Sequence, residues 1–418
     1  MEQNVFKSII GYAEVKQEMT RILDQLKHPD KYEALGVTEP HGLLLHGVPG
    51  VGKSTFANAF LEASERTMFV CQKDKSNGDF VNEIVKIFDE AAKAAPSIIL
   101  LDDLDKFANE DENRRDASEF VTVQTCIDRV KDHQVFVVAT VNNMRKLPIS
   151  LTRAGRFDHV LELRSPSGED AQNIVAHYLS KKAFVKDVDV RRIGRLLSGK
   201  SCAELESVVN QAGAYAAYEG RTQVEMKDMI KAILRLIFKS PESFREDVRT
   251  LPYIACHEAG HALVSELLEP DSVDLVTVLN HDSFAAGVTS TSRDESYLHS
   301  KQLMENRVMC VLAGKAATEI TFGVVDTGVS CDLDIAFHIV ERFIGKYCSY
   351  GFDKYIESGS TEVTDRRENR IAAEMECYYA KTKKLLVENK SKLDALTKCL
   401  VEEKTLLGDR VQEILKCA

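Results

Sequence analysis

Residues 42–62 read GLLLHGVPGVGKSTFANAFLE, and this stretch decides the fold of the first half of the chain. An apolar run leads into Gly47-Val-Pro-Gly-Val-Gly-Lys-Ser54, which matches the pattern GxxxxGK[ST], and a helical pattern follows. A strand, a glycine-rich loop and a helix in this order form a phosphate-binding loop, because backbone N–H groups and the helix N-terminus face the anion. Lys53 is expected to reach the β and γ phosphates of ATP, and Ser54 to bind Mg²⁺. The predicted nucleotide contacts of this loop are Gly47, Gly50, Val51, Gly52, Lys53, Ser54 and Thr55.

Acidic and basic side chains suited to nucleotide hydrolysis follow downstream. The run Ile98-Ile-Leu-Leu101 ends in Asp102 and Asp103. At a strand end, Asp102 can hold the Mg²⁺ shell and Asp103 can orient or deprotonate the attacking water. Asn142 ends the strand pattern VFVVATV, and either Arg153 or Arg156 in SLTRAGRFD can stabilise the transition-state charge. If that arginine acts on a neighbouring subunit, the nucleotide lies at a subunit boundary and the ATPase needs a ring.

Apolar runs alternate with helical patterns as far as residue 163, which predicts an α/β domain with a parallel sheet. The pattern is then purely helical to about residue 238, a pattern typical of a small lid domain. The segment KSPESFREDVRT breaks this pattern, and a third, mainly helical domain follows. The predicted domains are a nucleotide-binding domain at 1–165, a lid at 166–238, a linker at 239–250 and a third domain at 251–418.

Composition limits the possible partners and compartments. The 418 residues carry 54 Lys and Arg against 65 Asp and Glu, a net charge of -11, which disfavours binding to nucleic acid or anionic lipid. The 10 Cys lack regular spacing, which indicates reduced thiols and a cytoplasmic protein. No window approaches the ~20 apolar residues of a membrane helix, and the N-terminus lacks a signal-peptide pattern. A truncated form from the cytoplasmic face of a membrane is the alternative.

The third domain contains a metal-binding pattern. His257-Glu258-Ala-Gly-His261 is HExxH within the helical stretch YIACHEAGHALVSEL. Two imidazoles at i and i+4 share one helix face and can hold Zn²⁺, and Glu258 is placed to take a proton from water that attacks a peptide carbonyl. A catalytic zinc site needs a third protein ligand. Asp332 in TGVSCDLDIAF is the preferred candidate, and residue type alone leaves Glu319, Asp334, His281 and His338 as alternatives.

Together these motifs resemble the FtsH family of AAA+ zinc metalloproteases over nearly the whole chain. The similarity runs through GLLLHGVPGVGKS, APSIILLDDLDK, TRAGRFD, GKSCAELESVVNQA, HEAGH and TGVSCDLD, in that order. The resemblance implies an AAA+ module with a parallel sheet and helical lid, followed by a mostly helical zinc peptidase domain, assembled as a homohexamer. It also implies an ATP-dependent metalloendopeptidase that threads unfolded, damaged or tagged proteins to a zinc chamber.

The resemblance also assigns individual positions. Asp332 matches the third zinc ligand, Arg153 and Arg156 match arginine-finger positions, and Asn142 matches a nucleotide-sensing position. The adenine contacts implied are Ile10, Gly11 and Ala203. The segment AAGVT at 285–289 resembles the family's substrate-binding edge strand.

Three departures from the family pattern leave other functions open. Asp103 stands where the family has Glu, which sets the carboxylate back by about one C–C bond, ~1.5 Å. The segment CQKDKSNGDFVNEIVKIF at 71–88 is shorter than its counterpart and lacks the pore motif, with Phe80 as a weak substitute. The chain also begins almost at the ATPase module, without the usual membrane helices. The alternatives are a zinc peptidase whose ATPase ring gates or scaffolds without threading, and a nucleotide-dependent chaperone ring.

Overall fold

The computed structural model describes residues 5–73, 80–107, 117–153, 155–182, 185–240, 249–279, 287–291, 300–324, 327–347 and 361–418. The chain forms two compact units, residues 1–229 and 230–418, and the division falls within helix α9 (Met226–Leu236). Most of the predicted linker, residues 241–248, lies outside the described residues. The domain boundaries deduced from sequence therefore stay predictions.

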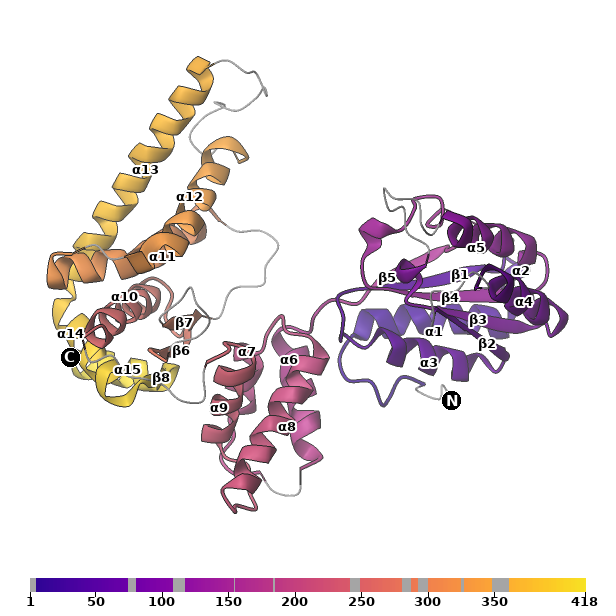
Figure 1. Ribbon diagram of the computed structural model, residues 1–418, viewed down its shortest axis with the longest axis horizontal. Helices are drawn as coiled ribbons and strands as arrows, with labels where there is room; N and C mark the ends of the chain where they lie inside the picture. The colour runs from indigo at the N-terminus through magenta and orange to yellow at the C-terminus, as the bar shows by residue number, and fades with distance from the viewer. Residues whose placement is uncertain are drawn as a thin grey trace. The chain divides into compact units, whose positions relative to one another are not determined.

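The first unit is built on a five-stranded parallel sheet with the strand order β2-β3-β4-β1-β5 (Figure 1). This sheet confirms the parallel α/β arrangement that the alternating apolar runs predict up to residue 163. The three central strands are buried on both faces, which explains why their sequences are continuous apolar runs and not alternating ones. The strands are β1 (Gly42–His46), β2 (Thr67–Gln72), β3 (Ser97–Asp102), β4 (Val135–Val141) and β5 (His159–Glu162).

Helices cover both faces of this sheet. Leu44 belongs to one core with α4 and α5, whereas its neighbours Leu43 and Leu45 belong to a second core with α1 and α3. This alternation follows from the period of two along a strand. The helices around this sheet are α1 (Ala13–Lys27), α2 (Pro29–Glu33), α3 (Lys53–Ser64), α4 (Phe80–Lys93) and α5 (Ala117–Val130), with short 3₁₀ turns at Leu104–Lys106 and Met144–Lys146.

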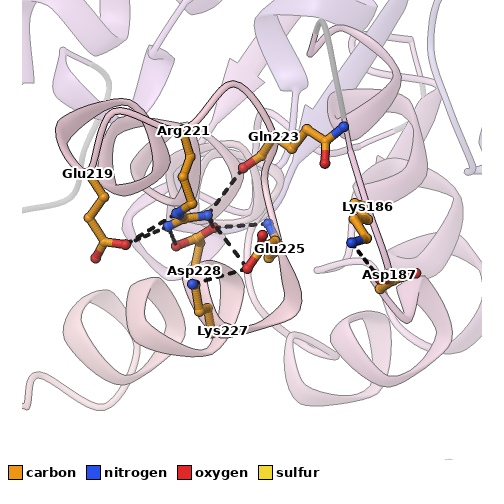
Figure 2. Close-up of polar contacts among 8 residues, drawn as sticks. All are labelled: Lys186, Asp187, Glu219, Arg221, Gln223, Glu225, Lys227 and Asp228. Carbon is orange, nitrogen blue, oxygen red and sulfur yellow. Dashed lines mark hydrogen bonds and ion pairs between the residues drawn. The ribbon is translucent and has the colours of Figure 1, made fainter.

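The lid consists of α6 (Gly168–Ser180), α7 (Val190–Leu196), α8 (Cys202–Tyr218) and α9. Helix α8 begins with a capping box, in which Ser201 and Glu204 satisfy each other's backbone N–H groups. An ion-pair network ties the turn between α8 and α9 (Figure 2). Arg221 donates to both carboxylate oxygens of the buried Asp228, at 2.5 and 2.7 Å, and this contact lowers the pKa of Asp228. Glu219 contacts the same guanidinium at 2.8 Å.

The second unit is mostly helical, as predicted. Its central helix α10 (Leu251–Leu268) packs against α11 (Lys301–Phe322) and α14 (Lys390–Glu403) around one apolar core. A second core lies between α11, α12 (Ser330–Gly345) and the long helix α13 (Thr361–Glu388). A 3₁₀ turn at Thr327–Val329 leads into α12, and α15 (Gly408–Cys417) ends the chain.

A small antiparallel sheet with the order β7-β6-β8 accompanies these helices. It contains β6 (Val273–Thr277), β7 (Val288–Thr291) and β8 (Thr405–Leu407), and β7 is an edge strand. Among the described residues, no helix has the length and apolar character needed to cross a bilayer. The structure describes nine cysteines, in both units, and all nine are free thiols.

Candidate metal centre and nucleotide site

The glycine-rich loop joins β1 to α3, as the sequence predicts. Gly50 and Gly52 have φ values of 81° and 99°, a left-handed backbone that favours glycine. Helix α3 begins at Lys53, with Ser54 and Thr55 exposed in its first turn. The Lys53 side chain is buried, and its Nζ donates to the carbonyl oxygens of Gly47 and Val48 at 2.8 and 3.0 Å. Burial lowers the pKa of Lys53, against the opposing charges of Asp103, Asp105 and Asp102.

The two predicted acids lie where β3 ends, beside the end of β4. Thr140 donates to Asp102 Oδ1 at 2.6 Å and accepts the backbone N–H of Asp103 at 2.8 Å. Asn142 Nδ2 donates to Asp103 Oδ1 at 2.7 Å, and Lys106 Nζ lies 2.6 Å from Asp103 Oδ2. Both oxygens of the Asp103 carboxylate are therefore engaged. The structure brings Asp102, Asp103 and Asn142 together, as the motifs imply.

Sequence reasoning missed two supporting residues here. Asp105 is 6% exposed and accepts the backbone N–H groups of Asn142 and Asn143, at 3.1 and 3.3 Å. Thr140 is 1% exposed and is the one polar residue in the strand VFVVATV. A lone hydroxyl in a buried strand was the available signal, because a buried polar group needs partners.

The two candidate arginines differ in their environment. Arg156 forms a bidentate pair with Asp128 of α5, at 2.7 and 3.0 Å, and also donates to the carbonyl of Ser150. The guanidinium holds the pKa of Asp128 down at about 2. Arg153 is exposed, and its side chain forms no ion pair or hydrogen bond with the described part of the chain. Of the two candidates, Arg153 is therefore the one whose guanidinium is not held by a described side chain.

Two of the three predicted adenine contacts, Ala203 and Gly11, lie close to the phosphate loop or to the lid. The backbone N–H of Ala203, in the first turn of α8, donates to the Gly50 carbonyl at 3.1 Å. Gly11 has a φ of 73°, and a Cβ there would come within 2.8 Å of the Asp170 carboxylate. The next residue, Tyr12, places its hydroxyl 3.2 Å from the Val51 carbonyl and 3.4 Å from Cys202 Sγ. The structure shows no contact that distinguishes Ile10, whose side chain is half-buried.

In the second unit, three candidate metal ligands converge. His257 and His261 lie one turn apart on α10, and Asp332 lies in the first turn of α12. The two Nε2 atoms are 3.0 Å apart, and each is 3.1 Å from Asp332 Oδ2. The sequence alternatives are not part of this group. Asp334 and His338 are exposed, Glu319 pairs with Lys383 of α13, and His281 lies outside the described residues.

This donor set fits a zinc ion. Two ligand atoms about 2.0–2.1 Å from one tetrahedral zinc would be about 3.3 Å apart, close to the separations found here. His261 Nδ1 donates to the Cys310 carbonyl at 2.7 Å, which directs Nε2 towards the other two ligand atoms, and Nε2 can bind a metal once it has released its proton. Burial alone would raise the pKa of Asp332, but hydrogen bonds from both imidazoles hold it well below its usual range. Burial lowers the pKa of His261, but the hydrogen bond and charge of Asp332 outweigh this effect and raise it to about 9.

Glu258 lies beside this centre and is not one of its ligands. Its side chain is 6% exposed, and burial raises the pKa of its carboxyl group. Thr289 of β7 donates to Glu258 Oε2 at 2.7 Å. A Cβ on Gly287 would lie 2.7 Å from Glu258 Cγ and Oε1. Both contacts come from the segment predicted as an edge strand, although Ala285 and Ala286 of that segment lie outside the described residues.

A further glycine makes room for the two imidazoles. A Cβ on Gly314 of α11 would lie 2.5 Å from Nε2 of both His257 and His261. Sequence reasoning missed Gly314, Thr289 and Gly287 as site residues. A glycine inside a helical pattern is the only local signal for Gly314, because such a glycine usually has a packing or functional reason.

Two family descriptions match separate parts of the chain. Residues 43–165 match the ATPase family associated with various cellular activities (AAA), and residues 247–414 match peptidase family M41. The ATP-dependent zinc metalloprotease FtsH of Thermobaculum terrenum is 30% identical to the chain, over 98% of this chain and 68% of that relative. The chain belongs to the FtsH family of ATP-dependent zinc metalloproteases. This result confirms the family and the fold class expected from the motifs.

Other FtsH proteins show the same extent of similarity. The relative from Thermus thermophilus is 28% identical over 98% of this chain and 70% of its own length. The relative FtsH 2 from Phytoplasma mali is 27% identical over 99% of this chain. The chain spans 63% of that relative's length.

The pore segment is only partly described in this FtsH family member, because residues 74–79 lie outside the described residues. Phe80 is 3% exposed and packs its ring edge-on against Phe107, with the centroids 5.1 Å apart. The suggestion that Phe80 replaces the pore aromatic is therefore wrong. Its ring belongs to the core between α4 and the sheet.

Proposed function

We propose that the chain is an ATP-dependent zinc metalloendopeptidase that degrades unfolded or damaged proteins. ATP hydrolysis takes place in a homo-oligomeric ring, with six subunits expected, and is coupled to peptide-bond hydrolysis. The observation that carries this proposal is the convergence of His257, His261 and Asp332 with the buried carboxylate of Glu258 beside them. The FtsH relatives carry the description ATP-dependent zinc metalloprotease, which supports both halves of the proposal.

The roles within the peptidase site follow from the contacts. His257, His261 and Asp332 hold Zn²⁺, which supplies Lewis acidity towards a water molecule and a peptide carbonyl. Glu258 accepts the proton of the attacking water and returns it to the departing amine. The Cys310 carbonyl fixes the tautomer of His261, and the first turn of α12 places Asp332 opposite both imidazoles. An extended substrate is expected to pair with the edge strand β7.

The roles within the ATPase site are also proposals. Gly47, Gly50, Val51, Gly52 and Thr55 contact the phosphates together with Lys53, while Ser54 and Asp102 hold Mg²⁺. Asp103 orients the attacking water, and Asn142 reports on the nucleotide through its hydrogen bond to Asp103. Ile10, Gly11 and Ala203 form the adenine side of the site. Arg153 is the better candidate for a finger that acts on a neighbouring subunit, since Arg156 is committed to Asp128.

One observation favours a second candidate function. The Asp103 side chain is shorter than the Glu that the family has at this position, and Lys106 and Asn142 bind its two carboxylate oxygens. A misplacement of about 1 Å can cost a hundredfold in rate, so slow hydrolysis would fit a ring that gates or scaffolds the peptidase without threading. A chaperone ring without peptidase activity is the third candidate. The complete Glu258 and ligand set argues against it.

We place the protein in the cytoplasm or at the cytoplasmic face of a membrane. The free thiols fit a reducing compartment, and the net charge of -11 argues against nucleic acid as a partner. Its expected partners are unfolded or tagged protein substrates and further copies of the same chain. We expect the protein at the cytoplasmic face of a membrane if it carries a membrane anchor like those of other family members.

Replacement of Glu258 tests the peptidase half of this proposal. We expect zinc-loaded wild-type protein to cleave a fluorescent unfolded casein, and Glu258→Gln to lower the rate by about 10²-fold or more, since general acid–base catalysis contributes 10²–10⁴. Zinc content should remain equal in both proteins, because Glu258 is not a ligand. Equal cleavage by the Gln variant would contradict the assigned role, and no cleavage by zinc-loaded wild type would favour the chaperone.

A further inference from the structure

Glu258 of the HExxH motif is in contact with a residue outside that motif, Thr289 of β7. Thr289 Oγ1 donates to Glu258 Oε2 at 2.7 Å, and the Glu258 main-chain carbonyl lies 3.2 Å from the same hydroxyl. Thr289 is half-buried, Gly287 is buried, and Glu258 is 6% exposed. The carboxylate is thus held in a confined space, where a hydroxyl donor has a fixed partner and little competition from water.

We propose that Thr289 is a positioning residue for Glu258, and that Gly287 leaves the space in which the carboxylate is held. This inference rests on the proposed peptidase function and adds to it Thr289 of β7 and Gly287, which directly precedes β7. The hydroxyl donates to Oε2, and no hydrogen bond from the described residues reaches the other oxygen, Oε1, which can therefore accept a proton from water. The base is then presented to water through Oε1, while Oε2 fixes its orientation.

The space around the carboxylate is set by Gly287. A Cβ at this position would lie 2.7 Å from both Cγ and Oε1 of Glu258 and 2.9 Å from Cδ. Since real Cβ atoms avoid such distances, any larger residue would push the carboxyl group out of its place. Thr289 therefore holds the side chain from one side, and Gly287 permits that position from the other.

Thr289 belongs to β7, and Gly287 directly precedes this strand. Among the described residues, β7 pairs with β6 and with no second strand, and Thr289 lies opposite Val276 in that pairing. A peptide that adds to the free edge of β7 would therefore bind to the same strand that orients the base. The register of the bound peptide and the position of Glu258 would be fixed by one element.

Replacement of Thr289 by Val removes the hydroxyl and keeps the size and β-branching of the side chain. We expect kcat for casein cleavage to fall about 10-fold to 100-fold, as misplacement of a catalytic group by about 1 Å costs up to a hundredfold. KM and zinc content should stay within about twofold of wild type, because no metal or substrate contact is removed. Thr289→Ser restores the hydroxyl and should recover most of kcat.

Thr405→Val is the matched control, because Thr405 lies in the same small sheet on β8, at the opposite edge from β7, and its hydroxyl pairs with Thr277 at 2.8 Å. Its kcat should equal that of the wild type. A wild-type kcat in Thr289→Val would overturn the inference. So would equal losses in the Thr405→Val control, or a Thr289→Ser variant as slow as Thr289→Val, since these results would indicate a general effect on the sheet.

Thr289→Ala gives the same comparison if the Val variant fails to fold, and is judged by the same rescue with Ser. Failure of the proposed peptidase function looks different from failure of this inference. In the first case zinc-loaded wild type does not cleave casein at all, and both proposals fall. In the second case the wild type cleaves, Glu258→Gln does not, and Thr289→Val cleaves as fast as wild type.

Discussion

At the scale of single residues, both candidate sites depend on neighbouring groups that hold the reactive side chains in place by hydrogen bonds. The hydroxyl of Thr140 joins Asp102 to the backbone of Asp103, and the Cys310 carbonyl holds His261. Such contacts matter because a catalytic or metal-binding side chain must be held within a fraction of an ångström. Three residues of this kind, Gly314, Gly287 and Thr289, contribute space or orientation without chemistry of their own.

Gly314 gives a direct test of this principle. The methyl group of Gly314→Ala would lie 2.5 Å from Nε2 of His257 and His261, so the two imidazoles cannot keep their positions. We expect zinc affinity to fall about 10-fold to 100-fold and casein cleavage to be lost, with helix content unchanged. A zinc titration against a chromophoric chelator measures the affinity.

Gly345→Ala is the control for the same change on a neighbouring helix, since nothing lies within 4 Å of a Cβ placed there. Alanine favours a helix over glycine by about 1 kcal/mol, so neither variant should unfold for lack of helix propensity. Wild-type zinc affinity in Gly314→Ala would show that the imidazoles occupy other positions.

The sequence predicted the chemically reactive residues better than their supports. The phosphate loop and HExxH are local patterns. The roles of Lys53, His257, Glu258 and His261 could therefore be predicted from a few adjacent residues. Asp332 lies 71 residues beyond His261, and residue type alone could not separate it from four competitors. The resemblance to the family selected it, and the converging ligand atoms support that choice.

At the scale of elements, packing between helices of the second unit positions the metal ligands. Helices α10 and α11 approach closely at Gly260, where a Cβ would come within 2.6 Å of the Ala313 carbonyl and of Ala317 Cβ. This approach brings Gly314 and Cys310 of α11 against the two histidines of α10. Helix α11 is in turn fixed to α13 by a charged cluster around Glu319.

That cluster predicts a pH dependence of stability. Lys383 contacts Glu319 at 2.5 Å, Tyr379 donates to the same carboxylate, and Lys315 lies 3.3 Å away. The contact with Lys383, followed by that with Tyr379, lowers the pKa of Glu319 to about 2. Because the folded pKa is below the ordinary value of about 4.3, the stabilisation is complete above that value and is lost as the pH falls towards 2.

Glu319→Gln should therefore destabilise the protein at pH 7, and the difference from wild type should shrink between about pH 5 and pH 2. The Glu319 side chain is 30% exposed, so solvent screening limits the expected difference at pH 7 to about 1 kcal/mol. Urea unfolding of both proteins at the same metal loading measures it. Zinc content should not change, and a pH-independent difference would mean that the ionised carboxylate is not the stabilising group.

Elements were predictable where their own sequence determines them. The five parallel strands are short apolar runs, of which the three central ones are buried, and the lid helices have a clear helical period, so both were found from local pattern. Strand β8 was not predicted, because Thr405–Leu407 is only three residues long and forms by pairing with β6. The edge strand β7 was recognisable as a strand, but its contact with Glu258 depends on the tertiary fold.

At the scale of the whole molecule, the chain joins a nucleotide-binding unit to a peptidase unit, in the order found in the FtsH family. The two sites lie on separate units, residues 1–229 and 230–418. Any influence of ATP on cleavage must therefore pass between units or between subunits of a ring. Coupling of this kind, and not the presence of either site alone, is the central claim.

The rate of cleavage of a fluorescent unfolded protein, measured with and without ATP, tests this claim most directly. We expect ATP to raise the rate for zinc-loaded wild type, because Lys53 binds the nucleotide phosphates and hydrolysis drives substrate into the peptidase site. Lys53→Ala should keep the basal rate and lose the ATP stimulation. If the wild-type rate is the same with and without ATP and is unaffected by Lys53→Ala, the ATPase ring acts as a gate or scaffold and the claim of coupling is wrong.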